Sequence, residues 1–136
     1  MSNNYGTPGL GNPGAFQVSG VPFATSSAQN EITQTPVRIS FPYVTSWLLL
    51  KNIDATTGHD LRVGFSQNGV LTSGNYFLLE GGTNAKTFTP AIDVKCTEIW
   101  IMANSSNACA YSLIAGLTHI PTQEIYQNWS GSVGVG

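Results

Sequence analysis

Apolar and polar residues alternate in short runs along this chain, and this period of two restricts its fold more than any other feature. Every second side chain is apolar in residues 37–41 and again in residues 61–65. Successive side chains of a β-strand point to opposite faces, so such runs are typical of strands with one buried face. The best helical candidate, residues 121–127 beginning with a proline, spans only about two turns. The pattern predicts an all-β protein.

Residues 47–53 are apolar more continuously than the other runs. Such a strand is expected to be buried on both faces, or to lie between the core and a neighbouring molecule. Leu49, in its middle, is expected to point into the core. An Asn-Gly pair at residues 68–69 predicts a turn within a later loop. The remaining predicted strands are residues 15–23, 32–35, 75–80, 85–89, 94–103 and 108–117.

About eight short strands separated by regular turn signals are typical of a β-sandwich or barrel. Eight strands in two four-stranded sheets form a jelly roll, so the predicted fold is a single eight-stranded jelly-roll β-sandwich. An immunoglobulin-like sandwich is the rival arrangement. The separation between Cys96 and Cys109 is too short for the disulfide that joins the two sheets of that family.

Three regions of different composition divide the chain. Residues 1–14 are dominated by Gly, Pro and Asn and predict an extended N-terminal arm, because they bury too little apolar surface to offset the entropy of ordering. Residues 15–120 form the predicted jelly-roll domain, and residues 121–136 form a Gly-rich C-terminal tail. Apolar residues in the arm and the tail are candidate inter-subunit contacts: Tyr5, Leu10, Tyr126, Trp129, Val133 and Val135.

Charge is unusually scarce. Asp, Glu, Lys and Arg make up 9% of the 136 residues, against about 25% in typical domains, and the net charge is −2. Five cationic residues disfavour a surface that neutralises nucleic-acid phosphates. The longest apolar run is far shorter than a membrane span, and no secretory signal is recognisable at the N-terminus, so the protein is expected to be neither membrane-inserted nor secreted. A neutral polar surface suits contact with neighbouring subunits, because the contact leaves no buried charge without a partner.

Catalysis needs titratable side chains held close together, and the chain offers one sequence-local cluster. Asp54, His59 and Asp60 lie in and just after a loop. One histidine and two carboxylates without regular spacing are weak support for an acid–base pair or a metal site, so a solvated loop end is expected. His119, at a strand exit, is expected to be structural or interfacial. No catalytic residue, metal ligand or cofactor is predicted, and the protein is expected not to be an enzyme.

The chain contains two cysteines and two triplets that match the N-glycosylation pattern. Cys96 and Cys109 are expected to be reduced thiols buried on neighbouring strands, although a disulfide between them stays open. Asn104 and Asn128 each begin an Asn-x-Ser triplet. In a chain without a secretory signal, and with so many Asn and Ser, these triplets are expected to be coincidental.

Four segments together resemble a known family. They are Trp47–Ile53 (WLLLKNI), Asp60–Val70 (DLRVGFSQNGV), Asn75–Glu80 (NYFLLE) and Leu113–Thr118 (LIAGLT). In this order they are similar to the small single jelly-roll penton proteins of large icosahedral double-stranded DNA viruses of the nucleocytoplasmic type. The resemblance covers about residues 37–120, which is most of the chain.

The resemblance implies a structural role in a virion. Penton proteins form homopentamers that close the five-fold vertices of an icosahedral capsid, where they meet trimers of the major capsid protein and minor capsid proteins. A capsid cement or decoration protein, or a fibre head, is the alternative within the same class. A carbohydrate-binding jelly-roll module is less favoured, since strand-borne aromatics belong more often to a core or to cross-strand pairs. The aromatics in question are Tyr43, Trp47, Tyr76, Phe77, Trp100 and Tyr111.

Overall fold

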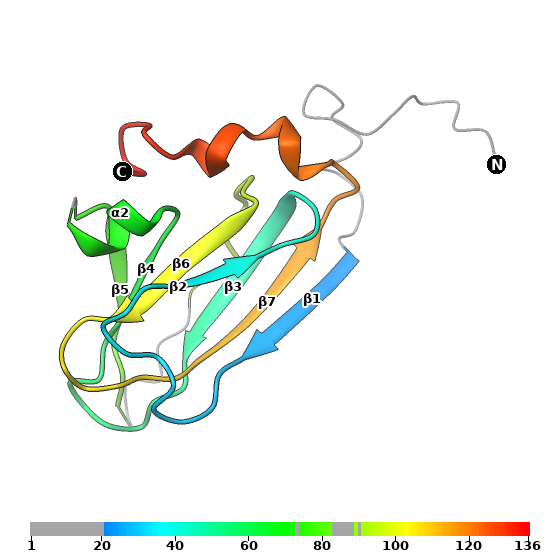
Figure 1. Cartoon of the computed structure of the whole chain (residues 1–136). Coiled ribbons are helices and arrows are strands. Elements are labelled where there is room, and N and C mark those ends of the chain that lie inside the picture. Colours follow the sequence, from blue (N-terminus) through cyan, green and yellow to red (C-terminus); the bar gives the residue numbers. More distant parts are fainter. Residues whose placement is uncertain (1–20, 73, 83–88, 90) are drawn as a thin grey trace, which may run out of the picture.

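Two antiparallel β-sheets packed face to face form the body of the molecule (Figure 1). The computed structural model describes residues 21–72, 74–82, 89 and 91–136. Within these residues the strands are β1 (Val21–Ser26), β2 (Val37–Ser40), β3 (Thr45–Asn52), β4 (Leu61–Gly64), β5 (Tyr76–Leu79), β6 (Glu98–Ala103) and β7 (Tyr111–Leu117). The predicted all-β sandwich is confirmed.

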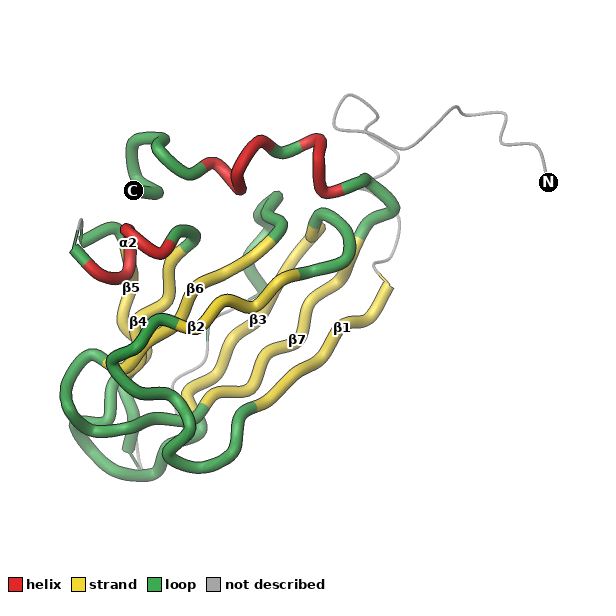
Figure 2. Tube along the Cα trace, viewed as in Figure 1, coloured by secondary structure: helices red, strands yellow, loops and turns green. Residues whose placement is uncertain are grey.

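The sheets differ in size and draw their strands from alternating parts of the chain. One sheet has the order β1-β7-β3 and the other has the order β2-β6-β4-β5, with antiparallel neighbours throughout. Figure 2 shows the two sheets as separate layers, with β2 and β6 in front of β3, β7 and β1. Strands that are distant in sequence, such as β1 and β7, are therefore neighbours in space.

A further segment runs along the free edge of β3. The amide of Thr89 donates to the carbonyl oxygen of Leu50 at 2.8 Å. Ile92 and Leu48 exchange two backbone hydrogen bonds of 2.7 and 3.0 Å. These bonds extend the three-stranded sheet beyond β3 by a short, interrupted pairing.

Inward-facing side chains of both sheets form one core. Along β3, Leu48 and Leu50 are fully buried, while Leu49 between them is half-buried and points to the other side of the sheet. The prediction that Leu49 faces the core is therefore wrong. A run of leucines hides the period of two, so the sequence alone does not fix which of its members point inward. The other fully buried members of the core include Ile32, Leu61, Val63, Ile99 and Ile101.

Three predicted strands begin or end three or four residues from the expected position, and one of them, β7, begins at Tyr111 instead of residue 108. β1 extends to Ser26, beyond the predicted end at residue 23, because its pairing with β7 continues to Ser112. The predicted strand at 94–103 joins the sheet only from Glu98, while the residues before it bond to β3 of the opposite sheet, as in the 3.0 Å bond from the Thr45 amide to the Cys96 carbonyl oxygen.

Two further predicted strands are reduced or only partly seen. Residues 32–35 form a single isolated bridge, from Ile32 to Cys109, in place of a strand. Of the predicted strand at 85–89, residue 89 alone is described. Residues 15–20 of the first predicted strand, and the predicted arm at 1–14, lie outside the described residues.

The predicted turn at residues 68–69 is instead part of a short helix, α2 (Gln67–Leu71). The hydroxyl of Ser66 accepts a hydrogen bond from the Gly69 amide at 2.9 Å and caps the helix. Serine is a favoured N-cap because its oxygen satisfies an amide that the first turn leaves unpaired. Val70 is fully buried and ties the helix to the sandwich.

The C-terminal segment crosses one end of the sandwich (Figure 1). In place of the two-turn helix considered for 121–127, it forms the short 3₁₀ turns η1 (Thr122–Glu124) and η2 (Tyr126–Trp129). Ile125 between them is buried with Val44 and Ile120 in a small second cluster. The segment is therefore part of the folded body.

Candidate functional site

The outer face of sheet β1-β7-β3 carries rows of apolar side chains. Strand pairing aligns three rows on it: Pro22–Gly116–Trp47, Ala24–Ile114–Leu49 and Ser26–Ser112–Lys51. The first two rows are apolar throughout, and the third is polar. We call this set the outer apolar face.

Each row has an exposed residue on β1, and the middle row adds an exposed residue on β7. Ile114 on β7 is 41% exposed, although large aliphatic side chains at sheet centres are normally covered. Trp47 lies across the neighbouring strand, because a Cβ at Gly116 would collide with its indole ring. Glycine at position 116 therefore allows an aromatic ring to lie directly on β7 and widen the apolar surface.

The outer face of sheet β2-β6-β4-β5 has a different chemistry. Arg38 forms a 2.9 Å ion pair with Glu98, and the Trp100 indole N–H donates to the same carboxylate at 2.5 Å. The Arg62 guanidinium lies 4.5 Å from the centre of the Tyr76 ring. This face thus carries an ion pair and the charge of Arg62, whereas the outer apolar face carries only the charge of Lys51.

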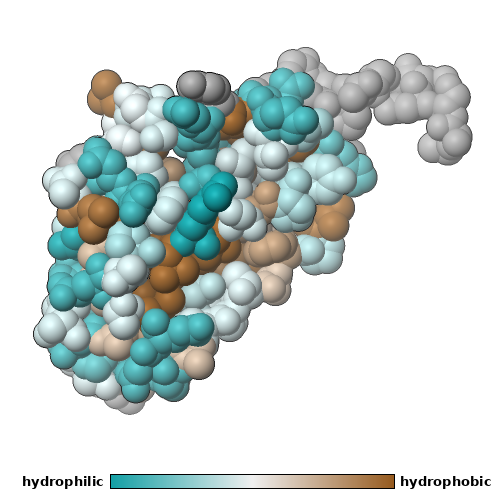
Figure 3. All heavy atoms as spheres, in the orientation of Figure 1, coloured by the Kyte–Doolittle hydropathy of each residue, from teal (hydrophilic) through white to brown (hydrophobic). Residues whose placement is uncertain are grey.

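A second apolar area lies at the edge of the sandwich between β1 and β2. Figure 3 shows hydrophobic surface between these two strands. Val21 of β1 is 43% exposed, and Phe23 and Val37 are partly buried against the core. No further strand pairs with β1 or β2 on this side among the described residues. Sheet β1-β7-β3 thus carries apolar surface both on its outer face and at its β1 edge.

The predicted inter-subunit residues of the tail occupy three different environments. Trp129 is 40% exposed, and its indole N–H donates to the Lys95 carbonyl oxygen at 2.6 Å. Val133 is fully exposed. The carbonyl oxygen of Val135 accepts a 2.8 Å bond from the Ser66 hydroxyl at the start of α2. Tyr126 begins η2. Tyr5 and Leu10 lie outside the described residues.

Asn128 is the structural residue that sequence reasoning missed. Its side chain is 2% exposed and makes five hydrogen bonds. The carboxamide oxygen accepts from Thr97 and from the Glu98 amide, and the nitrogen donates to the carbonyl oxygens of Phe65 and Glu98, both at 2.8 Å. The triplet that begins at Asn128 gives no sign of this role, since the pattern matches glycosylation instead.

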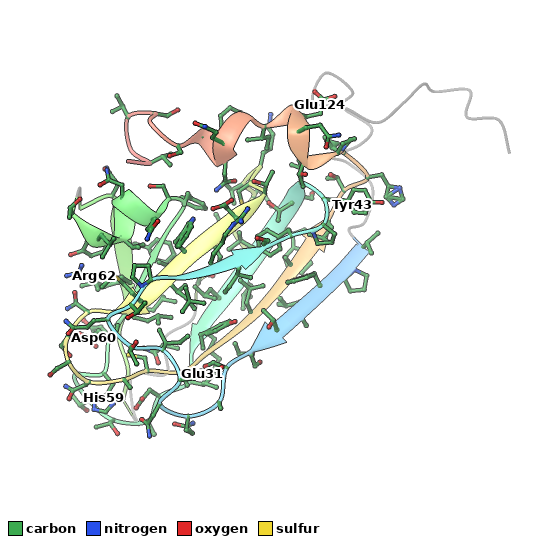
Figure 4. All side chains as sticks on the ribbon, viewed as in Figure 1. Glu31, Tyr43, His59, Asp60, Arg62 and Glu124 are labelled. Atoms are coloured by element: carbon green, nitrogen blue, oxygen red, sulfur yellow. The ribbon has the colours of Figure 1, made fainter. Side chains whose placement is uncertain are left out.

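The predicted cluster of Asp54, His59 and Asp60 is a tightly packed loop. Asp54 is 4% exposed, so the expectation of a solvated loop end is wrong for this carboxylate. It accepts from the Thr56 amide at 2.9 Å and lies 3.1 Å from Nδ1 of His59. Asp60 accepts from the Gly81 amide at 3.3 Å. The side chains hold neighbouring backbone in place, and Figure 4 shows His59 and Asp60 at the end of the sandwich opposite Tyr43 and Glu124.

Both cysteines are buried free thiols, which confirms their predicted burial. They do not lie on neighbouring strands: Cys96 precedes β6 and bonds to Thr45, while Cys109 precedes β7 and bridges Ile32. Burial raises the pKa of each thiol to about 11. Both thiols are therefore neutral near pH 7, in contrast to reactive cysteines, whose pKa is lowered.

Within the described ranges, no group of three or more His, Cys, Asp and Glu residues is placed to hold a metal ion. None of the described helices has the length and apolar character needed to cross a membrane. Comparison of the chain with protein-family models, with curated protein sequences and with solved structures finds no match.

Proposed function

We propose that the chain is a structural virion protein, a penton subunit whose homopentamers close the five-fold vertices of an icosahedral capsid. The observation that carries the proposal is the outer apolar face, which a monomer leaves in contact with water. Removing apolar area from water is favourable by about 25 cal/mol per Å², and part of this gain offsets the entropy lost on association. A second copy of the chain is its partner in this proposal. The five-fold number comes from the family resemblance of residues 37–120 and not from the face itself.

The strand order supports the jelly-roll topology that the proposal requires. Successive strands from β1 to β4 alternate between the two sheets, and β6 and β7 do the same. Thr89 and Ile92 hydrogen-bond to the free edge of β3, the edge at which a fourth strand would complete this sheet of a jelly roll. A strand at this edge would give each sheet four strands.

The proposed partners are further copies of the chain, trimers of the major capsid protein and minor capsid proteins at the capsid vertex. Closed rings require a heterologous contact, in which one surface of a subunit meets a different surface of the next. The difference between the two outer faces suits such a contact, because one is apolar and the other carries the Arg38–Glu98 ion pair and the charge of Arg62. The scarcity of charge also suits it, since charged residues are depleted from interface cores.

The native mass of the purified full-length chain, measured by multi-angle light scattering, tests the proposal. The expected result is a species of about five times the 14.4 kDa of one chain. A trimer would contradict the pentamer and favour a fibre head or a decoration protein. A monomer at every concentration, together with absence of the chain from the vertices in a virion map, would overturn the capsid role.

A further inference from the structure

A depression of about 570 Å³ lies where three segments meet: the start of β3, the residues that lead into β6, and the C-terminal segment. This volume is within the range of about 300–1,000 Å³ that small-molecule sites occupy. Its lining residues are Ser46, Asp93, Val94, Lys95 and Trp129. None of them belongs to the outer apolar face.

Unusual backbone conformation brings Trp129 to this depression. Gln127, Asn128 and Trp129 have φ values of 47°, 51° and 65°, three successive non-glycine residues in the left-handed region. Each such residue costs of the order of 1–3 kcal/mol, and such strain clusters at functional sites. The hydrogen bonds of the buried Asn128 side chain hold this conformation, and the bond from the Trp129 indole N–H to Lys95 fixes the ring. The indole is thus held beside the depression while 40% exposed.

A second irregularity brings Ser46 to the same place. Thr45 pairs with Leu117 and Trp47 pairs with Gly116, so Ser46 is the extra residue of a β-bulge. A bulge bends its strand and re-aims a side chain, and bulges are over-represented beside active sites. Two independent departures from regular backbone therefore place side chains on one depression.

The wall between these two residues is held rigidly and carries both signs of charge. The Thr45 hydroxyl donates to the Val94 carbonyl oxygen at 2.6 Å and accepts from the Cys96 amide at 3.1 Å. Asp93 and Lys95 flank Val94 and are exposed. A carboxylate accepts hydrogen bonds and an ammonium group donates them. Because their charges cancel, the wall favours a neutral ligand that both donates and accepts.

We propose that this depression binds the pyranose ring of a neutral sugar. A pyranose has a C–H face that packs on an aromatic ring and hydroxyl groups that both donate and accept hydrogen bonds. The indole of Trp129 offers the flat apolar surface, while the exposed carboxylate of Asp93 offers a hydrogen-bond acceptor at its rim. A phosphate-bearing ligand is disfavoured because Asp93 would repel it. The inference is independent of the proposed penton role, since a monomer presents the same depression.

Saturation-transfer NMR on the full-length chain with glucose, galactose, mannose and N-acetylglucosamine, followed by a glycan array, tests the inference. At least one pyranose is expected to bind saturably. Trp129→Ala is expected to weaken this binding by about tenfold or more. Asp93→Asn tests the polar rim separately and is expected to weaken binding without unfolding, because the residue is exposed.

Two further variants distinguish the loss of ring stacking from an effect of any aromatic substitution on the protein. Trp129→Phe keeps an aromatic face and loses the bond to Lys95, so binding is expected within a few-fold of the native chain. Tyr43→Ala removes an aromatic side chain of similar exposure, 44%, that does not line the depression, and binding is expected to stay unchanged. The melting temperature of each variant, measured alongside, identifies any that fails to fold.

Absence of saturable binding to every sugar, or binding that survives both Trp129→Ala and Asp93→Asn in folded protein, would overturn the inference. The mass measurement on the same samples reports the penton proposal independently. A sugar-binding monomer would sustain this inference and contradict that proposal.

Discussion

Asn128 shows how much one side chain contributes to the position of a whole segment. It connects the C-terminal segment to the residues that begin β6 and to Phe65 after β4. A carboxamide suits this position, because it offers both donors and acceptors to backbone groups that burial would otherwise leave unpaired. The same hydrogen bonds hold the neighbouring Trp129 beside the depression that Asp93 and Lys95 also line.

Asn128→Ala is expected to destabilise the fold by about 2–4 kcal/mol, because buried backbone groups of Thr97, Glu98 and Phe65 lose their partner. Urea unfolding followed by tryptophan fluorescence measures this loss. Asn107→Ala is the matched control: Asn107 is exposed, so its replacement is expected to change stability by less than about 0.5 kcal/mol. Equal stability of the two variants would show that the five hydrogen bonds of Asn128 contribute no net stability.

The buried thiol of Cys96 predicts a loss of stability in alkali. Burial raises its pKa from 9.0 to about 11. Between these values the unfolded chain releases the proton and the folded chain retains it, so the contribution is complete below pH 9 and is lost as the pH rises toward 11. Between pH 8 and pH 10.5 the native chain is expected to lose about 2 kcal/mol more than Cys96→Ala. Identical pH profiles of the two chains would contradict a buried neutral thiol.

Strand β3 shows which aspects of an element the sequence reveals. The apolar run at 47–53 predicted either a strand buried on both faces or one between the core and a neighbour, and the structure has one face in the core and one face outward. Leu48 and Leu50 are buried, and Leu49 belongs to the outer apolar face. Composition identified the strand. Which of its side chains point into the core depended on its pairing with β7, which no local pattern encodes.

Adjacent leucines on β3 give a matched test of that assignment. Leu50→Asp places an unpaired charge in the core and is expected to unfold the domain, since the cost of several kcal/mol is comparable with a typical total stability of about 5–15 kcal/mol. Leu49→Asp is expected to leave a folded chain, destabilised by less than about 2 kcal/mol, and to reduce the native mass toward one subunit. Circular dichroism and light scattering measure the two effects. A folded Leu49→Asp oligomer of unchanged mass would exclude this face from the contact.

Helix α2 is the element for which local reasoning chose the wrong structure. An Asn-Gly pair is typical of tight hairpin turns, and it predicted a turn here. The helix forms because Ser66 caps it and because Val70 is buried against the sandwich. The Ser66 hydroxyl also donates to the carbonyl oxygens of Val135 and Gly136, at 2.8 and 2.9 Å. Contacts with a segment nearly seventy residues away are invisible to a local turn signal.

At the scale of the whole molecule, the two outer faces differ enough to restrict how copies associate. If two outer apolar faces met each other, the contact would be isologous and assembly would stop at a dimer. A ring needs the outer apolar face to meet a different surface, such as the sheet that carries Arg38 and Glu98 or the open edge at β1 and β2. The native mass therefore reports the geometry of the contact as well as the stoichiometry.

The fold class, the positions of most strands and the scarcity of charge were predictable from the order and composition of the residues. These properties are local or compositional: a period of two follows from strand geometry, and charge is counted without knowledge of contacts. The burial of both cysteines was predicted for the same reason, since thiols without a metal-ligand pattern are usually core residues.

Which surfaces face outward, and which residues contact one another, became clear only from the packed structure. The outer apolar face depends on the register of β1, β7 and β3. The hydrogen bonds of Asn128 depend on the C-terminal segment lying against the start of β6. The depression beside Trp129 depends on both a β-bulge and a left-handed turn. Each joins residues distant in sequence, and the free energy of such contacts comes from burial and pairing that exist only once the sheets have packed. No sequence pattern shorter than the whole chain specifies them.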